Sequence, residues 1–212
     1  MSYIYSPYEE QIWNALSAFI GNDYGVAGLM GNLYAESGLI PGRVENDFTS
    51  GYTVSQEYTD KLNNGQVTRE EFRWNTIPPQ IAGGNPQYGP GYGLAQWTYY
   101  TRKYNYYDYF TAGQHGQAGS VQFDTWFLIW ELQTDFSGVY NVLVSATSVR
   151  QASDKVLHDF ENPEQQGPAV EVVRAQYGQN LYNQYHGTGP TPPVPPRPRR
   201  KLPIIFYLRN PI

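Results

Sequence analysis

Residues 22–38 read Asn-Asp-Tyr-Gly-Val-Ala-Gly-Leu-Met-Gly-Asn-Leu-Tyr-Ala-Glu-Ser-Gly, and this stretch predicts a helix that ends in a glutamate. Asn22 or Asp23 is suited to cap the N-terminus of that helix. Gly38 and then Pro41 indicate where the helix ends. Apolar residues recur between these limits at the three- and four-residue spacing of a helix face. They are Val26, Leu29, Met30 and Leu33.

Glu36 continues this apolar stripe, so we expect its side chain to point toward the packed face of the helix. Burial and the negative end of the helix dipole would both disfavour a carboxylate there. The pattern therefore predicts a raised pKa for Glu36, the property that a general acid needs near neutral pH. From this segment alone, the alternative is a glutamate at a helix end whose carboxylate turns out to solvent.

The second informative stretch is the uncharged loop Gly91–Thr98, Gly-Tyr-Gly-Leu-Ala-Gln-Trp-Thr. Its glycines exclude a helix and let the backbone approach another group closely. Gln96 offers donors and an acceptor that can read the acetamido and hydroxyl groups of an amino sugar. Tyr92 and Trp97 offer aromatic faces on which a sugar ring can stack. The alternative is a structural turn with Trp97 in the core.

Three stretches, taken in order, resemble the phage tail lysozyme family, a branch of the superfamily of goose-type lysozymes and lytic transglycosylases. They are Asn32–Gly38, the Gly91–Thr98 loop with Arg102 and Lys103 after it, and Phe160–Pro163, and the similarity extends over about residues 10–185. The resemblance implies a lysozyme-like helical fold without a cofactor.

The same resemblance implies roles for particular residues. Glu36 matches the catalytic acid, and Ser37 matches the serine of the family's Glu-Ser pair. Gly93, Gln96 and Trp97 match the loop of the substrate groove, where we also expect Tyr92 and Arg102.

Helical patterns dominate the rest of the chain, so the predicted fold class is mainly α. Ser6 to Glu9 resembles a capping box for a first helix, and Thr98, Ser120 and Ser148 are candidate N-caps for later ones. The expected helices cover about residues 7–20, 23–37, 55–63, 68–74, 98–111, 121–136, 148–160 and 168–185. Residues 42–90 form an irregular lid with a possible short β-hairpin.

The composition excludes several kinds of site. There is no cysteine among the 212 residues, so thiol catalysis and thiolate metal sites are impossible. The three histidines lack metal-ligand spacing, and we expect no metal and no cofactor. We also expect no signal peptide and no transmembrane segment. The 20 tyrosines and 5 tryptophans fit either sugar stacking or contacts with neighbouring subunits.

The C-terminal region differs in composition from the rest. We predict a lysozyme-like domain over residues 1–186, a proline-rich linker over 187–198 and a basic, apolar tail over 199–212. All five basic residues after Gly187 lack an acidic neighbour, which gives that region +5 and the remainder −10. We expect an extended tail that docks onto other phage tail proteins. An acidic body argues against nucleic acid as a partner.

The patterns favour an enzyme that protonates a glycosidic oxygen, and the resemblance implies cleavage of the β-1,4 bond between N-acetylmuramic acid and N-acetylglucosamine in peptidoglycan. It would act in the virion or after release from the host cell. Hydrolysis is preferred, with Asp47 as the candidate that activates water. Two alternatives stay open: a lytic transglycosylase that works with one glutamate, and an inert tail-tip subunit that keeps the fold.

Overall fold

The computed structural model describes residues 6–45, 52–74, 90–113 and 115–188, and this part of the chain is mainly helical, without a β-strand. In chain order its helices are α1 (Glu9–Ile20), α2 (Asp23–Ser37), α3 (Tyr52–Asn63), α4 (Arg69–Trp74), α5 (Tyr100–Thr111), α6 (Val121–Thr134), α7 (Ser137–Ser145), α8 (Val149–Val156), a π-helix (Leu157–Glu161) and α9 (Pro168–Tyr185). The predicted fold class is confirmed.

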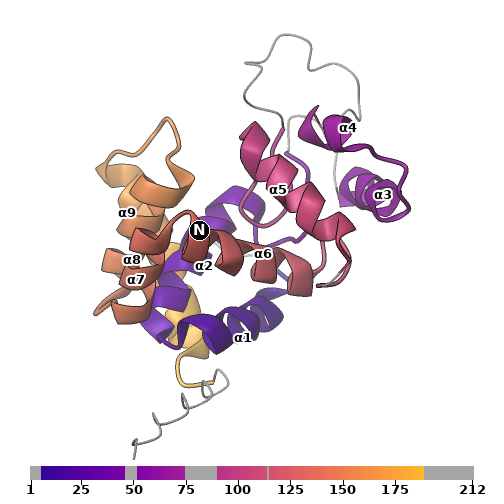
Figure 1. The fold of residues 1–212 in the computed structure, drawn as a ribbon. Helices are drawn as coiled ribbons and strands as arrows, with labels where there is room; N and C mark the ends of the chain where they lie inside the picture. Colours follow the sequence, from indigo (N-terminus) through magenta and orange to yellow (C-terminus); the bar gives the residue numbers. More distant parts are fainter. Residues whose placement is uncertain (1–5, 46–51, 75–89, 114, 189–212) are drawn as a thin grey trace, which may run out of the picture.

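The helix α2 is the centre of the fold. It packs against α1, α7, α8 and α9. Figure 1 shows α7, α8 and α9 gathered on one side of the molecule and α3, α4 and α5 on the other. Every residue of α2 from Gly25 to Leu33 is buried, so this helix is enclosed on all sides and not only along one stripe.

Glycines allow the neighbouring helices to approach α2 closely. A Cβ atom on Gly31 would lie 2.5 Å from the backbone oxygen of Arg174 on α9, and one on Gly28 would lie 2.5 Å from Cβ of Ala152 on α8. From the other side, a Cβ on Gly178 would lie 2.6 Å from the backbone oxygen of Ala27. These contacts fix the position of α9, and therefore of Arg174, relative to the end of α2.

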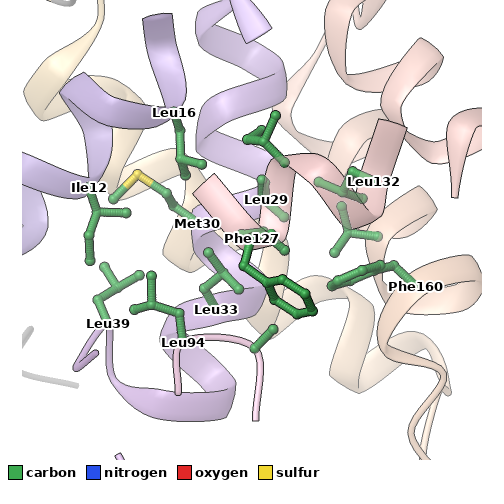
Figure 2. Packing of buried hydrophobic residues seen from close by; sticks show 14 of the residues in the cluster. Ile12, Leu16, Leu29, Met30, Leu33, Leu39, Leu94, Phe127, Leu132 and Phe160 are labelled. Carbon is green, nitrogen blue, oxygen red and sulfur yellow. The ribbon is translucent and has the colours of Figure 1, made fainter. Parts of the chain in front are cut away.

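The hydrophobic core surrounds α2 (Figure 2). Leu29, Met30 and Leu33 contribute from α2, and all three side chains are fully buried. Around them lie buried side chains from α1, α6, the π-helix and two loops. These are Ile12, Leu16, Phe127, Leu132, Phe160, Leu39 and Leu94. Burial of one such side chain contributes about 1.5–3 kcal/mol.

Most predicted helix ends are confirmed. Asn22, Ser120 and Ser148 each accept a backbone N–H of the first turn, and Gly38 ends α2 in the left-handed conformation. The N-terminal box is partly formed, because a carboxylate oxygen of Glu9 accepts the backbone N–H of Ser6, but α1 begins two residues later than expected.

Two of these predictions are wrong. Thr98 does not cap α5, whose N-cap position is Tyr99 without a side-chain cap bond. The helix expected over residues 121–136 ends at Thr134, and Ser137–Ser145 form α7, which the patterns did not predict. No helix among the described ranges is long and apolar enough to cross a membrane. The linker and tail beyond residue 188, and much of the predicted lid and hairpin, lie outside the described residues.

Candidate active site

A cavity of about 470 Å³ lies where the end of α2 meets the 91–98 loop, the start of α5 and the segment after the π-helix. It is lined by Glu36, Glu45, Gly91, Ala95, Gln96, Thr98, Arg102, Glu161, Asn162 and Pro163. Residues from the three stretches Asn32–Gly38, Gly91–Arg102 and Phe160–Pro163 therefore meet at one place. Of the predicted site residues, Glu36, Gln96 and Arg102 line this cavity.

Glu36 lies in the last turn of α2, where Gly38 adopts φ 66° and ends the helix. Its side chain is 22% exposed, so it reaches the cavity without lying open on the surface. Its carboxylate forms an ion pair with Arg174 of α9, with 2.6 Å between Oε1 and Nη2. The guanidinium of Arg174 also donates a hydrogen bond to Oδ1 of Asn32 at 3.3 Å. We expected the side chain of Glu36 to face apolar residues. In the structure its carboxylate forms an ion pair with Arg174 instead.

Ser37 does not face the cavity. Its side chain is fully buried, and its hydroxyl donates to the backbone oxygen of Leu33 at 3.1 Å. The backbone oxygen of Ser37 accepts a hydrogen bond from Nη1 of Arg43 at 2.9 Å. In this position Ser37 is the last residue of α2 and its polar groups are satisfied within the protein.

The loop that carries Gln96 is fixed to residues 42–45 by backbone hydrogen bonds. The N–H of Gly93 donates to the oxygen of Arg43, and the N–H of Glu45 donates to the oxygen of Gly91, both at 2.9 Å. Gly93 has φ 77°, and a Cβ atom there would lie 2.6 Å from the ring of Trp97. Glycine is required at this position because both the backbone conformation and the space exclude a side chain.

Tyr92 and Trp97 require a correction, because both are fully buried and neither offers a face to a bound sugar. The hydroxyl of Tyr92 lies 2.8 Å from that of Thr59. Nε1 of Trp97 donates to a carboxylate oxygen of Glu131 on α6 at 2.9 Å. The alternative noted from the sequence, a core tryptophan, describes Trp97. The two rings pack in the core and support the loop on its buried side.

Gln96 forms part of the cavity wall and has a left-handed backbone with φ 46°, which is uncommon for a residue other than glycine. Its Nε2 donates to the backbone oxygens of Arg43 and Gly93 at 3.0 and 2.9 Å. These two bonds fix the orientation of the side-chain amide of Gln96, and they occupy its N–H donors. Its carbonyl oxygen lies on the side of Gly91, where a Cβ atom would be only 2.6 Å away.

Arg102 extends from α5 to the cavity and is held on several sides. Its guanidinium donates two hydrogen bonds to Glu131, from Nε at 2.6 Å and from Nη2 at 2.7 Å. It also lies over the ring of Phe160, 4.5 Å from the centroid. Glu131 is fully buried and joins Arg102 to Trp97, so the cavity wall and the core share one hydrogen-bond network.

Glu161 is a cavity residue that the sequence reasoning did not assign. It ends the π-helix, where the N–H of Asn162 donates to the oxygen of Leu157 at 2.9 Å. Single π-turns occur frequently at functional sites. Oε1 of Glu161 is buried and has no hydrogen-bond partner among the described residues. Burial, and next the negative charge of Glu36, raise the pKa of Glu161 well above its ordinary value.

Glu45 also lines the cavity and was not predicted. Its Oε2 accepts the backbone N–H of Gly91 at 2.9 Å, which places its carboxylate beside the loop that carries Gln96. The predicted Asp47 lies outside the described residues. Within the described ranges, no group of three or more histidine, aspartate or glutamate side chains is arranged to hold a metal ion.

Asp124 on α6 joins the two loops behind the cavity. Oδ2 accepts the backbone N–H of Gly42 at 3.3 Å and of Leu94 at 3.1 Å, and Oδ1 accepts the hydroxyl of Tyr106 at 2.6 Å. Burial raises the pKa of Asp124 to about 6, although these hydrogen bonds act in the opposite direction. One sequence signal could have identified Asp124 and Glu131: they are the two acidic residues of a helix rich in apolar residues.

A family model described as phage tail lysozyme matches residues 8–185, which include every residue that lines the cavity. No curated protein matches the sequence.

Proposed function

The chain belongs to the phage tail lysozyme family, and from this premise we propose that it hydrolyses the β-1,4 bond between N-acetylmuramic acid and N-acetylglucosamine. Family membership supports a lysozyme-like, glycosidase-type function and implies peptidoglycan as the substrate. It also fits a protein that is carried in the virion or released to act on the cell wall.

In the proposed mechanism Glu36 is the general acid. It transfers a proton to the glycosidic oxygen as the bond to the anomeric carbon breaks, and water then attacks that carbon. The observation that carries this proposal is the position of Glu36, partly exposed at a cavity that it shares with Gln96 and Arg102. A cavity of about 470 Å³ is also within the usual size of a small-molecule or saccharide site.

Hydrolysis with two carboxylates requires a second acidic side chain near the broken bond. The described residues offer Glu45 and Glu161 at the cavity, and Glu45 is only two positions from the predicted Asp47. We propose that Glu45 orients or activates the attacking water, because its carboxylate is held by the N–H of Gly91, it lines the cavity and the residue is only partly buried.

Substrate contacts are proposed at Gln96 and Arg102, whose side chains line the cavity. Ser37, Tyr92, Gly93 and Trp97 are buried, so their contribution would be to shape the cavity and not to touch the glycan. We also propose that residues 1–186 form the catalytic domain, with 187–198 as a linker and 199–212 as a peptide that docks onto another tail protein.

A second candidate function is a tail subunit that keeps the fold and has lost catalysis. One observation favours it: the Glu36 carboxylate is already paired with Arg174 at 2.6 Å, as in a structural ion pair. We favour the enzyme because a structural ion pair does not require a cavity at that position.

A zymogram on purified peptidoglycan distinguishes these functions. The native chain is compared with Glu36→Gln and with Glu10→Gln, a control at an exposed glutamate of α1. Clearing by the native chain and the control, and none by Glu36→Gln, is the expected result. Absence of clearing by all three supports the inert subunit. Mass spectrometry of the fragments then separates hydrolysis, which gives reducing ends, from transglycosylation, which gives anhydro ends.

A further inference from the structure

The charges around the cavity do not balance if every acidic group is ionised. Arg174 is paired with Glu36, and Arg102 is paired with Glu131 through two hydrogen bonds. Each guanidinium thus already has a carboxylate partner of its own. Glu161 adds a third carboxyl group to this cluster, and no ion pair of Glu161 is found among the described residues.

The surroundings of Glu161 disfavour its charge. One of its oxygens is buried without a hydrogen-bond partner, and an ionised carboxylate in that state is costly. Burial and the nearby charge of Glu36 raise its pKa well above the ordinary value, while Arg102 and Arg174 act in the opposite direction. Three carboxyl groups therefore share two guanidinium charges, and the position of Glu161 favours its neutral form.

Two other titratable groups near this cluster, Glu45 and His158, do not supply a counter-charge to Glu161. Glu45, across the cavity, is itself acidic and accepts a hydrogen bond from Gly91. His158 belongs to the same π-helix, but its ring nitrogens contact Gln166 at 2.8 Å and Glu171 at 3.0 Å.

We propose that Glu36 and Glu161 act as a pair in which Glu161 holds a proton in the resting site and is the positioning residue that stores this proton for Glu36. This inference rests on the proposed function, in which Glu36 donates to the glycan. In the resting site Arg174 pairs with Glu36 as a carboxylate, so the proton resides on Glu161. Transfer to Glu36 prepares the donor and leaves the negative charge on Glu161.

The proton balance of one turnover closes within this pair. Glu36 gives its proton to the leaving glycosidic oxygen, and both glutamates are then ionised. The oxygen of the attacking water forms the new bond to the anomeric carbon, and a proton of that water passes by way of Glu45, the carboxylate proposed to activate it, back to the pair. The site then again holds one proton on two carboxyl groups, and no further reactant is needed.

The pH dependence of glycan cleavage tests the pairing. Glu161→Gln keeps the size and neutrality of the resting side chain but leaves Glu36 without a stored proton. We expect the alkaline limb of the pH–rate profile to move to lower pH by about one unit or more, with the acid plateau retained. At neutral pH this corresponds to a loss of about tenfold in rate. Glu164→Gln, an exposed glutamate three residues away, is the matched control and keeps the native profile.

An infrared measurement tests the stored proton without using activity. At neutral pH the difference spectrum between the native chain and Glu161→Gln should contain the band of one protonated carboxyl group, and the Glu164→Gln difference should lack it. Glu161→Gln should also unfold at a denaturant concentration no lower than the native chain, because it replaces a neutral group with a neutral one.

The outcomes separate this inference from the proposed function. If Glu36→Gln is inactive but Glu161→Gln has the native pH profile and no missing carboxyl band, the pairing is wrong and the enzyme assignment stands. If the native chain cleaves no peptidoglycan, the proposed function fails, while the infrared band still decides whether Glu161 holds a proton. A difference spectrum in which an ionised carboxylate is lost overturns the pairing in either case.

Discussion

Replacement of Gly31 by alanine tests the close approach of α9 to α2, which positions Arg174 beside Glu36. The added Cβ atom would lie 2.5 Å from the backbone oxygen of Arg174 and 2.6 Å from the backbone nitrogen of Gly178. Ordinary contacts begin at 3.4 Å, so α9 must move by close to 0.9 Å or α2 must distort. Both neighbouring atoms belong to the backbone and cannot move aside as a flexible side chain could. We therefore expect a loss of stability near the upper limit for overpacked substitutions.

Overpacking of this kind destabilises by about 1–3 kcal/mol. Alanine has a higher helix propensity than glycine and offsets up to about 1 kcal/mol of that cost. The expected net loss is therefore about 2 kcal/mol, which lowers Tm by about 4–8 °C for a chain of this size.

Denaturant titration followed by circular dichroism measures this difference. Gly138→Ala is the matched control, because Gly138 is in the first turn of α7 and has nothing within 4 Å of its added Cβ. The control should be as stable as the native chain or slightly more stable. Equal stability of Gly31→Ala and the native chain would refute the argument that the glycine is required by the helix contact.

Further predictions concern groups behind the cavity. The pKa of Asp124 is raised from 3.8 to about 6, so the folded state retains a proton that the unfolded state releases between these values. Its contribution to the free energy of unfolding therefore falls as pH rises from about 4 to 6, by about 3 kcal/mol in total. Asp124→Asn should lack this dependence, and a constant difference from the native chain across that window in urea titrations contradicts the prediction. Trp97→Phe removes the hydrogen bond to Glu131 but keeps a buried ring, and should cost about 1–3 kcal/mol by the same titrations. If the free energy of unfolding does not change, the two hydrogen bonds from Arg102 are sufficient to stabilise the buried carboxylate of Glu131.

Local patterns predicted the helices well, because their signals are contained in a few adjacent residues. The caps at Asn22, Ser120 and Ser148 and the glycine end at Gly38 depend on backbone bonds within one turn. The break between α6 and α7 was missed because Asp135 ends α6 without a glycine or proline to mark the stop. Thr98 was misassigned because its neighbour Tyr99 occupies the cap position.

The candidate site was predicted only in part, because burial and partners depend on the packing of distant segments. The sequence indicated that Glu36, Gln96 and Arg102 belong together, and the cavity brings them together. It did not indicate that Trp97 faces Glu131, since the two are 34 positions apart. The partner of Glu36, Arg174, lies on α9 and carries no local signal of that contact.

The same limit applies to Glu161. It was seen as part of a family motif, but its orientation depends on a π-turn that sequence periodicity does not reveal. A helix of regular 3.6-residue period would direct the side chain at position 161 elsewhere.

The most direct measurement of the central claim is the rate at which purified chains release soluble fragments from peptidoglycan near the pH optimum, for native protein and Glu36→Gln. A general acid contributes about 100-fold to 10,000-fold, so Glu36→Gln should release fragments at least about 100-fold more slowly, with glycan binding retained. If Glu36→Gln releases fragments at the native rate, Glu36 is not the proton donor.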